Sequence, residues 1–230
     1  MKKNRLLTFF SLSLVIGGIV LLLLPQITSH IIQQRTAENA EQTEEIAAED
    51  LQNNLTAKAD FDFDRISEIS PSETFLGEEQ VDDGLIVGRL FIPSIDLNLA
   101  VYNGVSDSIL HAGVGTMRPN LEMGEGNFPI AGHYSQNKKA LFGDLFSIEN
   151  NDRAYLTDNE SVYEYKIYDT KIVEETEVEW IEDQVANEHG EPVLSLMNCY
   201  YVNGRDTGKR YFVFGELVVV HDAAKENIAD

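Results

Sequence analysis

The sequence has 230 residues, of which 39 are Asp or Glu and 17 are Lys or Arg, so its formal net charge is −22. Hydrophobic residues make up 43% of the chain, which is enough to build a core, and the length corresponds to one or two domains. The strong negative charge argues against nucleic acid as a partner, and a single cysteine excludes both an intramolecular disulfide and a cysteine-rich zinc site.

The first predicted element is a transmembrane anchor over residues 6–25. Residues 6–24 form an almost unbroken apolar run that ends at Pro25, and about 20 apolar residues span the hydrocarbon core of a bilayer. The alternative is a cleaved signal peptide, whose apolar core is shorter and ends at a site of small residues. Residues 1–5 carry three basic side chains, which predicts a cytoplasmic N-terminus. We therefore expect a single-pass protein of the cell membrane, with the rest of the chain outside.

Residues 26–80 are predicted to form an acidic extracellular stalk or linker. Between residues 31 and 60 the chain is rich in Ala, Glu and Gln, which favours helix, but its apolar residues are too sparse to seal a core. We expect a solvated stalk that is helical or partly disordered. Residues 61–80 stay acidic, and their isolated apolar side chains are candidates for docking onto the next domain. These side chains are Phe61, Phe63, Ile66, Ile69 and Phe75.

Residues 81–221 are predicted to form an all-β domain, followed by a polar tail over residues 222–230. Short β-branched or aliphatic runs recur here between Pro, Gly and Asn residues, and many short strands at this spacing are typical of a sandwich or a barrel. The runs cover residues 85–92, 97–102, 128–131, 154–156, 162–173, 193–201 and 211–220. Within this domain, only residues 138–146 suggest a helical turn.

Cys199 and His133 are the candidate catalytic pair. A lone cysteine is most often a small buried hydrophobe, but Cys199 ends a strand-like run in a domain expected outside the cell. A thiol nucleophile needs a nearby base or positive charge. His133 ends the segment IAGH, where a strand meets a loop; the alternative is a structural histidine. The other histidines have no comparable setting; they are His30, His111, His189 and His221.

Arg210 is the candidate for stabilising an oxyanion. Lys209 and Arg210 open the last strand soon after the cysteine, and the forked, permanently charged guanidinium suits this role. The alternative is an ordinary surface base, and Arg205 in the preceding turn is a competitor. The acidic clusters at residues 174–179 and 182–183 lack the spacing of a calcium-binding loop. No P-loop, dinucleotide-binding fingerprint or H-E-x-x-H motif is present.

Four segments occur in the order and form of a known family. Residues 88–97 (GRLFIPSIDL) resemble its opening G-x-L-x-I-P-x-I-x-L pattern, and residues 127–133, with residues 113–117 before them, resemble the approach to its catalytic histidine. Residues 194–199 (LSLMNC) resemble its T-L-x-T-C motif, and Lys209-Arg210 heads the strand that carries its arginine. The chain thus resembles a sortase, most closely class A, the membrane-anchored cysteine transpeptidases of Gram-positive bacteria.

This resemblance implies a closed β-barrel of about eight strands with short helices. It also implies that Cys199, His133 and Arg210 are catalytic. Its substrates would be surface proteins that carry an LPxTG-like sorting signal, cleaved between Thr and Gly through an acyl-thioester. The acceptor would be the amine of a lipid-linked peptidoglycan precursor. No cofactor is required; some class A members use calcium, but the acids here match poorly, which leaves metal dependence open. These acids are Glu122, Glu125 and Glu182.

The residues expected to bind the substrate include two departures from the family pattern. They are Ala131, Ser195 and Asn198. Ser195 keeps the hydroxyl of the family's first threonine, whereas Asn198 replaces the threonine before the cysteine with an amide that also donates hydrogen bonds. Residues 61–70 lack the Asp-Pro of a class C lid, and residues 174–191 leave little room for the class B insertion. The alternative function is a catalytically weak or silent interaction module on the same barrel, tethered to the membrane.

Overall fold

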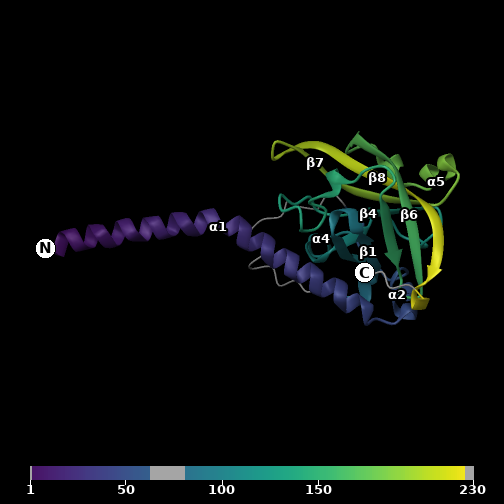
Figure 1. The fold of residues 1–230 in the computed structure, drawn as a ribbon, viewed down its shortest axis with the longest axis horizontal. Coiled ribbons are helices and arrows are strands. Elements are labelled where there is room, and N and C mark those ends of the chain that lie inside the picture. The colour runs from purple at the N-terminus through teal and green to yellow at the C-terminus, as the bar shows by residue number, and fades with distance from the viewer. Residues whose placement is uncertain (1, 63–80, 226–230) are drawn as a thin grey trace.

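A closed barrel of strands forms one end of the molecule, and a long N-terminal helix projects from it (Figure 1). The computed structural model describes residues 2–62 and 81–225. In that part of the chain, eight strands close in the order β1-β2-β3-β4-β7-β8-β6-β5. They are β1 (Ile86–Ile92), β2 (Leu97–Tyr102), β3 (Val114–Thr116), β4 (Asn127–Ala131), β5 (Arg153–Thr157), β6 (Ser161–Glu174), β7 (Val193–Val202) and β8 (Arg205–Asp222). The predicted closed β-barrel of about eight strands is confirmed.

Helices lie before and between the strands. The α-helices are α1 (Lys2–Glu44), α2 (Ala48–Asn54), α4 (Asp107–Ala112) and α5 (Gln184–His189). The short 3-10 helices are η2 (Asp83–Leu85), η3 (Pro93–Ile95), η4 (Leu145–Ser147), η5 (Val178–Ile181) and η6 (Ala223–Lys225). Neither α4 nor α5 was predicted. The helical turn predicted at residues 138–146 is instead a series of turns that ends in η4.

Seven of the strands follow apolar runs that the sequence predicted. The exception is β3, whose three residues are too few to show a period-two pattern. This short strand matters for the topology, because it pairs parallel to β2 and antiparallel to β4. β4 in turn pairs parallel to β7, so β3 and β4 bring the middle of the chain beside its C-terminal hairpin.

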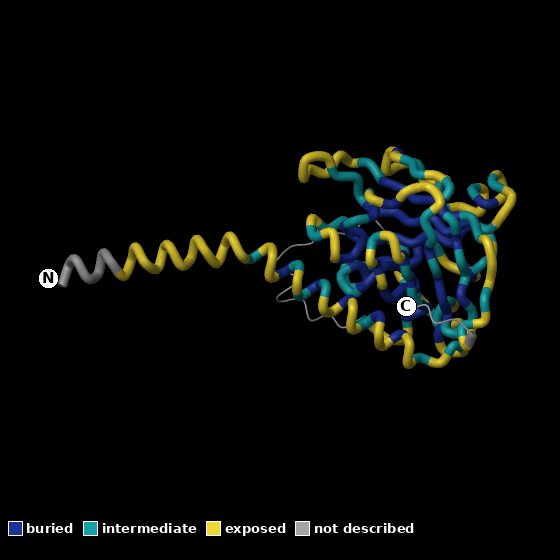
Figure 2. Tube along the Cα trace, viewed as in Figure 1, coloured by how far each residue is buried: buried dark blue, intermediate teal, exposed yellow. Residues whose placement is uncertain are grey.

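Buried residues run along the strands of the barrel (Figure 2). Their apolar side chains form two clusters, one on each face of the strands. One cluster takes alternate residues such as Leu196 and Val213 and fills the barrel interior. The second takes the opposite alternation, including Met197 and Phe212, and is covered by helical residues such as Ile109. Because β7 is buried on both faces from Val193 to Asn198, the backbone that leads to Cys199 is held in a fixed position.

Helix α1 has a projecting part and a packed part (Figure 1). The apolar side chains from Phe9 to Leu23 are exposed, and α1 is, within the described part of the chain, the one helix long and apolar enough to cross a membrane. From Thr28 onward, one face is buried against the barrel. Its members recur every three or four residues, as one helical face requires. They are Thr28, Ile32, Thr36, Ala40 and Thr43.

The packed part of α1 differs from the solvated stalk expected from residue 26 onward. The Asn159 amide nitrogen donates to the carbonyls of Thr43 and Ile46 at 2.7 and 3.0 Å, which satisfies backbone groups at the C-terminal end of the helix. The Asn39 amide donates to the Ala112 carbonyl at 2.9 Å. Composition concealed these contacts because the buried stripe is made mostly of small and polar residues. Most of the apolar residues expected to dock lie within residues 63–80, outside the described residues.

Leu51 of α2 provides a test of this docking. Its side chain is fully buried in the outer cluster with Ile86 and Tyr102. Replacing Leu51 by alanine should lower the free energy of unfolding by about 2–5 kcal/mol, because it leaves a cavity between α2 and the barrel. Denaturant unfolding of the full chain in detergent measures this change. The matched control is Gln42→Ala on the exposed face of α1, and equal stability of the two variants would contradict the docked arrangement.

Candidate active site

Three adjacent strands bring His133, Cys199 and Arg210 together. His133 lies two residues beyond the end of β4, whereas Cys199 and Arg210 lie inside β7 and β8, whose hairpin continues to Val202 and Arg205. In the parallel pair of β4 and β7, Ala131 lies opposite Met197, and the Gly132 amide donates to the Met197 carbonyl at 3.0 Å, one residue beyond β4. His133 lies two residues after Ala131, and Cys199 lies two residues after Met197, so His133 and Cys199 are level with one another. In the antiparallel pair of β7 and β8, Cys199 lies directly opposite Arg210. The register therefore places the predicted catalytic residues in one row.

The row lies on the outer face of the barrel. Side chains alternate along a strand, and Met197 and Phe212 belong to the outer cluster, so Cys199 and Arg210 point to the same outer side. His133 is 8% exposed, whereas Cys199 is half-buried. A nearly buried imidazole beside a partly accessible thiol is an arrangement that suits nucleophilic catalysis, because the base is held in place while the nucleophile can meet a substrate.

His111 is brought next to His133 by helix α4. The two ring centroids are 5.4 Å apart and the rings are tilted by 34°. Helix α4 is fixed at its start by the Ser106 hydroxyl, which accepts a hydrogen bond from the Ile109 amide at 3.2 Å. The sequence analysis gave His111 no role, because no local pattern around it indicates that α4 covers the end of β4.

Arg210 also contacts an acidic segment that follows β6. Its Nη2 donates to Glu175 Oε2 at 3.1 Å, and the neighbouring Lys209 Nζ donates to Glu174 Oε1 at 2.5 Å. The hydrogen bond to the Glu174 carboxylate raises the pKa of Lys209. Arg205, the competing candidate, pairs with Val202 at the far end of the hairpin. The geometry therefore favours Arg210 over Arg205 as the arginine beside Cys199.

All three predicted substrate-binding residues are buried. The Ser195 hydroxyl donates to Asn127 Oδ1 at 2.6 Å in a fully buried position. Asn198 is also fully buried, and its Nδ2 donates to the Phe142 carbonyl at 3.1 Å. Ala131 is 3% exposed and packs in the outer cluster beneath the row. The structure thus places all three around the site as support rather than at its surface.

An aromatic cluster adjoins the row, and the sequence analysis missed it. One aromatic residue directly follows each candidate catalytic residue, and a fourth tyrosine and a phenylalanine complete the set. The members are Tyr134, Phe146, Tyr200, Tyr201 and Tyr211. Tyr134 stacks on Tyr201 with centroids 4.6 Å apart, and Phe146 meets Tyr211 edge-on at 4.8 Å. These contacts connect the loop after β4 to the β7–β8 hairpin.

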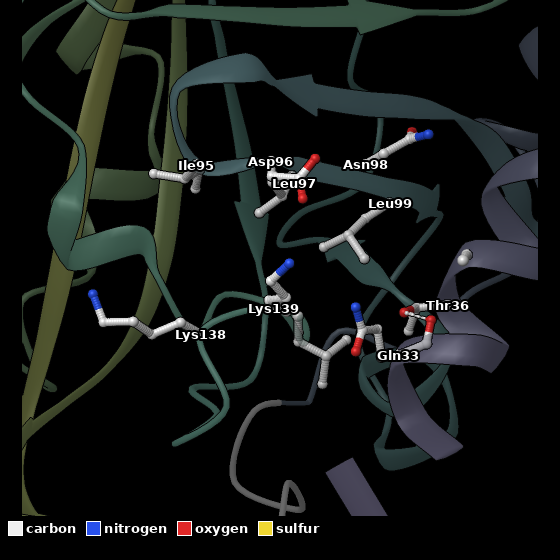
Figure 3. A pocket seen from close by; sticks show the side chains of 11 residues that line it. Gln33, Thr36, Ile95, Asp96, Leu97, Asn98, Leu99, Lys138 and Lys139 are labelled. Carbon is white, nitrogen blue, oxygen red and sulfur yellow. Dashed lines mark hydrogen bonds between the residues drawn. The ribbon is translucent and has the colours of Figure 1, made fainter. Parts of the chain in front are cut away.

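A separate pocket lies between α1 and the barrel (Figure 3). Its volume is about 120 Å³. Its lining comes from α1, from η3 and β2, and from the loop after β4, and contains none of the candidate catalytic residues. The lining residues are Gln33, Thr36, Ala37, Ile95, Asp96, Leu97, Asn98, Leu99, Lys138, Lys139 and Leu141. Among the described residues, no group of three or more His, Cys, Asp or Glu side chains is placed to hold a metal ion.

Comparison with known proteins identifies one family. The Sortase domain profile matches residues 90–218, which include the whole row. Sortase A of Listeria monocytogenes serovar 1/2a is 33% identical over 213 residues, covering 93% of this chain and 92% of that protein. Sortase A of Bacillus anthracis is 30% identical over 218 residues, covering 95% and 97%. The crystal structure of Listeria monocytogenes sortase A matches with a TM-score of 0.55 at 36% identity, over 61% of this chain and 92% of that one.

Proposed function

This chain belongs to the sortase family of cysteine transpeptidases, which anchor surface proteins, and we propose that it is a class A member acting on LPxTG-like sorting signals. The observation that carries the proposal is the register that aligns His133, Cys199 and Arg210 across three adjacent strands. Two sortase A relatives at 30% identity or more, each matched over most of its length, support class A. The acceptor we propose is the amine of a lipid-linked peptidoglycan precursor.

In the first half of the proposed reaction, the Cys199 thiol gives its proton to His133, and the sulfur attacks the carbonyl carbon of the Thr–Gly bond. A tetrahedral intermediate forms, and the Arg210 guanidinium stabilises the negative charge on its oxygen. The C–N bond then breaks as His133 donates a proton to the departing glycine amine. The products of this half are a thioester between Cys199 and the threonine acyl group, and a free peptide that begins with glycine.

In the second half, the acceptor amine attacks the thioester carbonyl and His133 removes a proton from it. The C–S bond breaks, the thiol is restored, and a new amide joins the surface protein to the acceptor. Water in place of the amine gives slow hydrolysis. Helix α1 would hold the enzyme at the membrane surface, where substrates and lipid-linked acceptors held in the same membrane can reach it. The basic residues before the anchor support a cytoplasmic N-terminus and an extracellular barrel.

A fluorogenic LPxTG peptide tests this function on the full chain in detergent, with and without triglycine as acceptor. We expect cleavage between Thr and Gly, and a ligated product when triglycine is present. The assay is run with and without calcium to test whether cleavage depends on this metal. A folded wild-type protein that cleaves no peptide under either condition would favour the silent interaction module instead.

Arg210 has a matched control in Arg205. Replacing Arg210 by alanine should lower kcat/KM by about 10²–10³-fold, because an oxyanion donor is lost. Arg205→Ala removes the same side chain from the hairpin end opposite Val202 and should leave kcat/KM unchanged. Steady-state kinetics with the LPxTG peptide measure both. If Arg205→Ala has the larger effect, the assignment of Arg210 is wrong.

A further inference from the structure

Two hydrogen bonds connect Asn198 to the backbone of His133. Asn198 Nδ2 donates to the Phe142 carbonyl at 3.1 Å, and the Phe142 amide donates to the His133 carbonyl at 3.1 Å. Phe142 thus accepts a hydrogen bond from Asn198, the residue before Cys199, and donates one to His133. Both Asn198 and Phe142 are fully buried, so water does not compete for these groups.

The position of Phe142 is fixed by close packing, so its hydrogen bonds can hold the His133 backbone in place. Its ring lies against Gly132, where an added Cβ would come within 2.6 Å of the ring. Gly132 immediately precedes His133, so the closeness of ring and backbone fixes the point at which the chain leaves β4. The residue before Phe142, Leu141, has a φ of 51°. A bulky residue in the left-handed region is unfavourable on its own, and surrounding contacts must hold it there.

If position 198 only filled space in the core, an apolar side chain would be expected there rather than an amide. Its Oδ1 is buried and has no hydrogen-bond partner among the described residues. Burying an unsatisfied acceptor lowers stability, and an apolar residue of the same branching avoids that loss. What the amide adds is the single donated bond to the Phe142 carbonyl, so the benefit of Asn198 lies in that bond.

We propose that Asn198 is a positioning residue that holds His133 in register with Cys199 through the Phe142 peptide. The proposal rests on the proposed function for its kinetic consequences. Its structural content is independent of any substrate: without the Asn198 bond, the segment after β4 moves and the imidazole shifts relative to the thiol. Misplacing a catalytic group by about 1 Å lowers rates by about 100-fold.

The first test separates activity from stability in the full chain. Asn198→Leu keeps the branching of the side chain and removes the donor, and Asn198→Ala serves as the second variant. We expect kcat to fall by about 10–100-fold with KM unchanged, while the melting temperature of Asn198→Leu stays close to that of the wild type. The lost bond is offset by removal of the unsatisfied Oδ1, and the Phe142 carbonyl still accepts from the Leu145 amide at 3.3 Å. If Asn198 had only a structural role, replacing it would lower the melting temperature before it lowered kcat. Unchanged kcat in both variants, or a loss of kcat only with a matching loss of melting temperature, would overturn the proposal.

Asn103 offers a matched control. It is 2% exposed, and its amide nitrogen donates to the carbonyls of Asn54, Leu55 and Ala57 at 2.8–3.2 Å. These bonds hold the N-terminal segment and do not reach β4, β7 or β8. Asn103→Leu should lower the melting temperature and leave kcat unchanged well below it. A fall in kcat equal to that of Asn198→Leu would show that any lost buried amide has this effect, which overturns the proposal.

The second test needs no substrate. In the His133→Cys variant, the introduced thiol, just beyond β4, is level with Cys199 of the neighbouring strand β7. Their disulfide is titrated with reduced and oxidised glutathione and quantified by mass spectrometry. Adding Asn198→Leu should lower the equilibrium constant for disulfide formation by about tenfold, whereas Asn103→Leu should not change it. An unchanged constant with Asn198→Leu would overturn the positioning role. A wild type that cleaves no LPxTG peptide would defeat the proposed function alone, because this titration does not depend on it.

Discussion

Replacing Cys199 by alanine is expected to reduce cleavage of an LPxTG peptide to background, a loss of at least about 10³-fold in kcat. The sulfur forms the bond to the acyl group, and alanine has no nucleophile to replace it. Because the chain contains a single cysteine, the variant has no thiol at all. Peptide fluorescence and product chromatography on the full chain measure the residual rate.

The Cys199→Ala variant must be folded for this result to count. Cys199 is only half-buried, so its loss should have little effect on the melting temperature. Cleavage between Thr and Gly at more than a trace rate in this variant would mean that the reaction proceeds without a thioester. The mechanism proposed above would then be wrong, whatever the role of His133.

The His133→Gln variant is expected to lose about 10²–10⁴-fold in kcat/KM. His133 is proposed to protonate the departing amine and then to accept a proton from the incoming one, and glutamine does neither. The dependence of kcat/KM on pH should also change, because the group proposed to transfer the proton has been removed. Kinetics across a range of pH with the LPxTG peptide measure both effects.

His221 and His189 are the controls for this variant. Their Nε2 atoms are hydrogen-bonded to Glu164 at 3.2 Å and to Glu216 at 2.9 Å. Both contacts lie away from the row along the strands, since Glu216 is opposite Val193 and His221 is opposite Val162. His221→Gln and His189→Gln should keep the wild-type rate and pH profile. If His133→Gln also keeps them, the general acid and base must be sought elsewhere, and His111, whose ring lies 5.4 Å from that of His133, is the next residue to test.

The strands were predictable because their apolar runs are long enough to show a pattern. Residues 162–173 alternate, and β6 extends over Ser161–Glu174. The short β3 carries no such signal, yet it joins β2 to β4. Helix α1 was half predicted: its apolar part is evident from composition, whereas the docking of its second part depends on small residues and on Asn159, which is more than 100 positions away.

At the candidate site, motifs indicated the residues and the fold gave their orientation. Cys199, His133 and Arg210 were found by their positions at strand ends, and the register placed them in one row. Asn198 was expected to contact the substrate because it precedes Cys199. Alternation along β7 instead points its side chain into the barrel, toward Phe142. The role of His111 depends on a helix packing across strands, which no local sequence pattern encodes.

Intact-mass spectrometry of the full chain with an LPxTG peptide, in the absence of an acceptor amine, tests the central claim most directly. We predict that the wild-type chain gains the mass of the peptide's acyl portion, ending at threonine, and that fragmentation places the adduct on Cys199. Adding triglycine should remove the adduct and release the peptide joined to triglycine. Cleavage of the peptide with no adduct on Cys199, or an adduct that triglycine does not remove, would contradict a cysteine transpeptidase acting through a thioester.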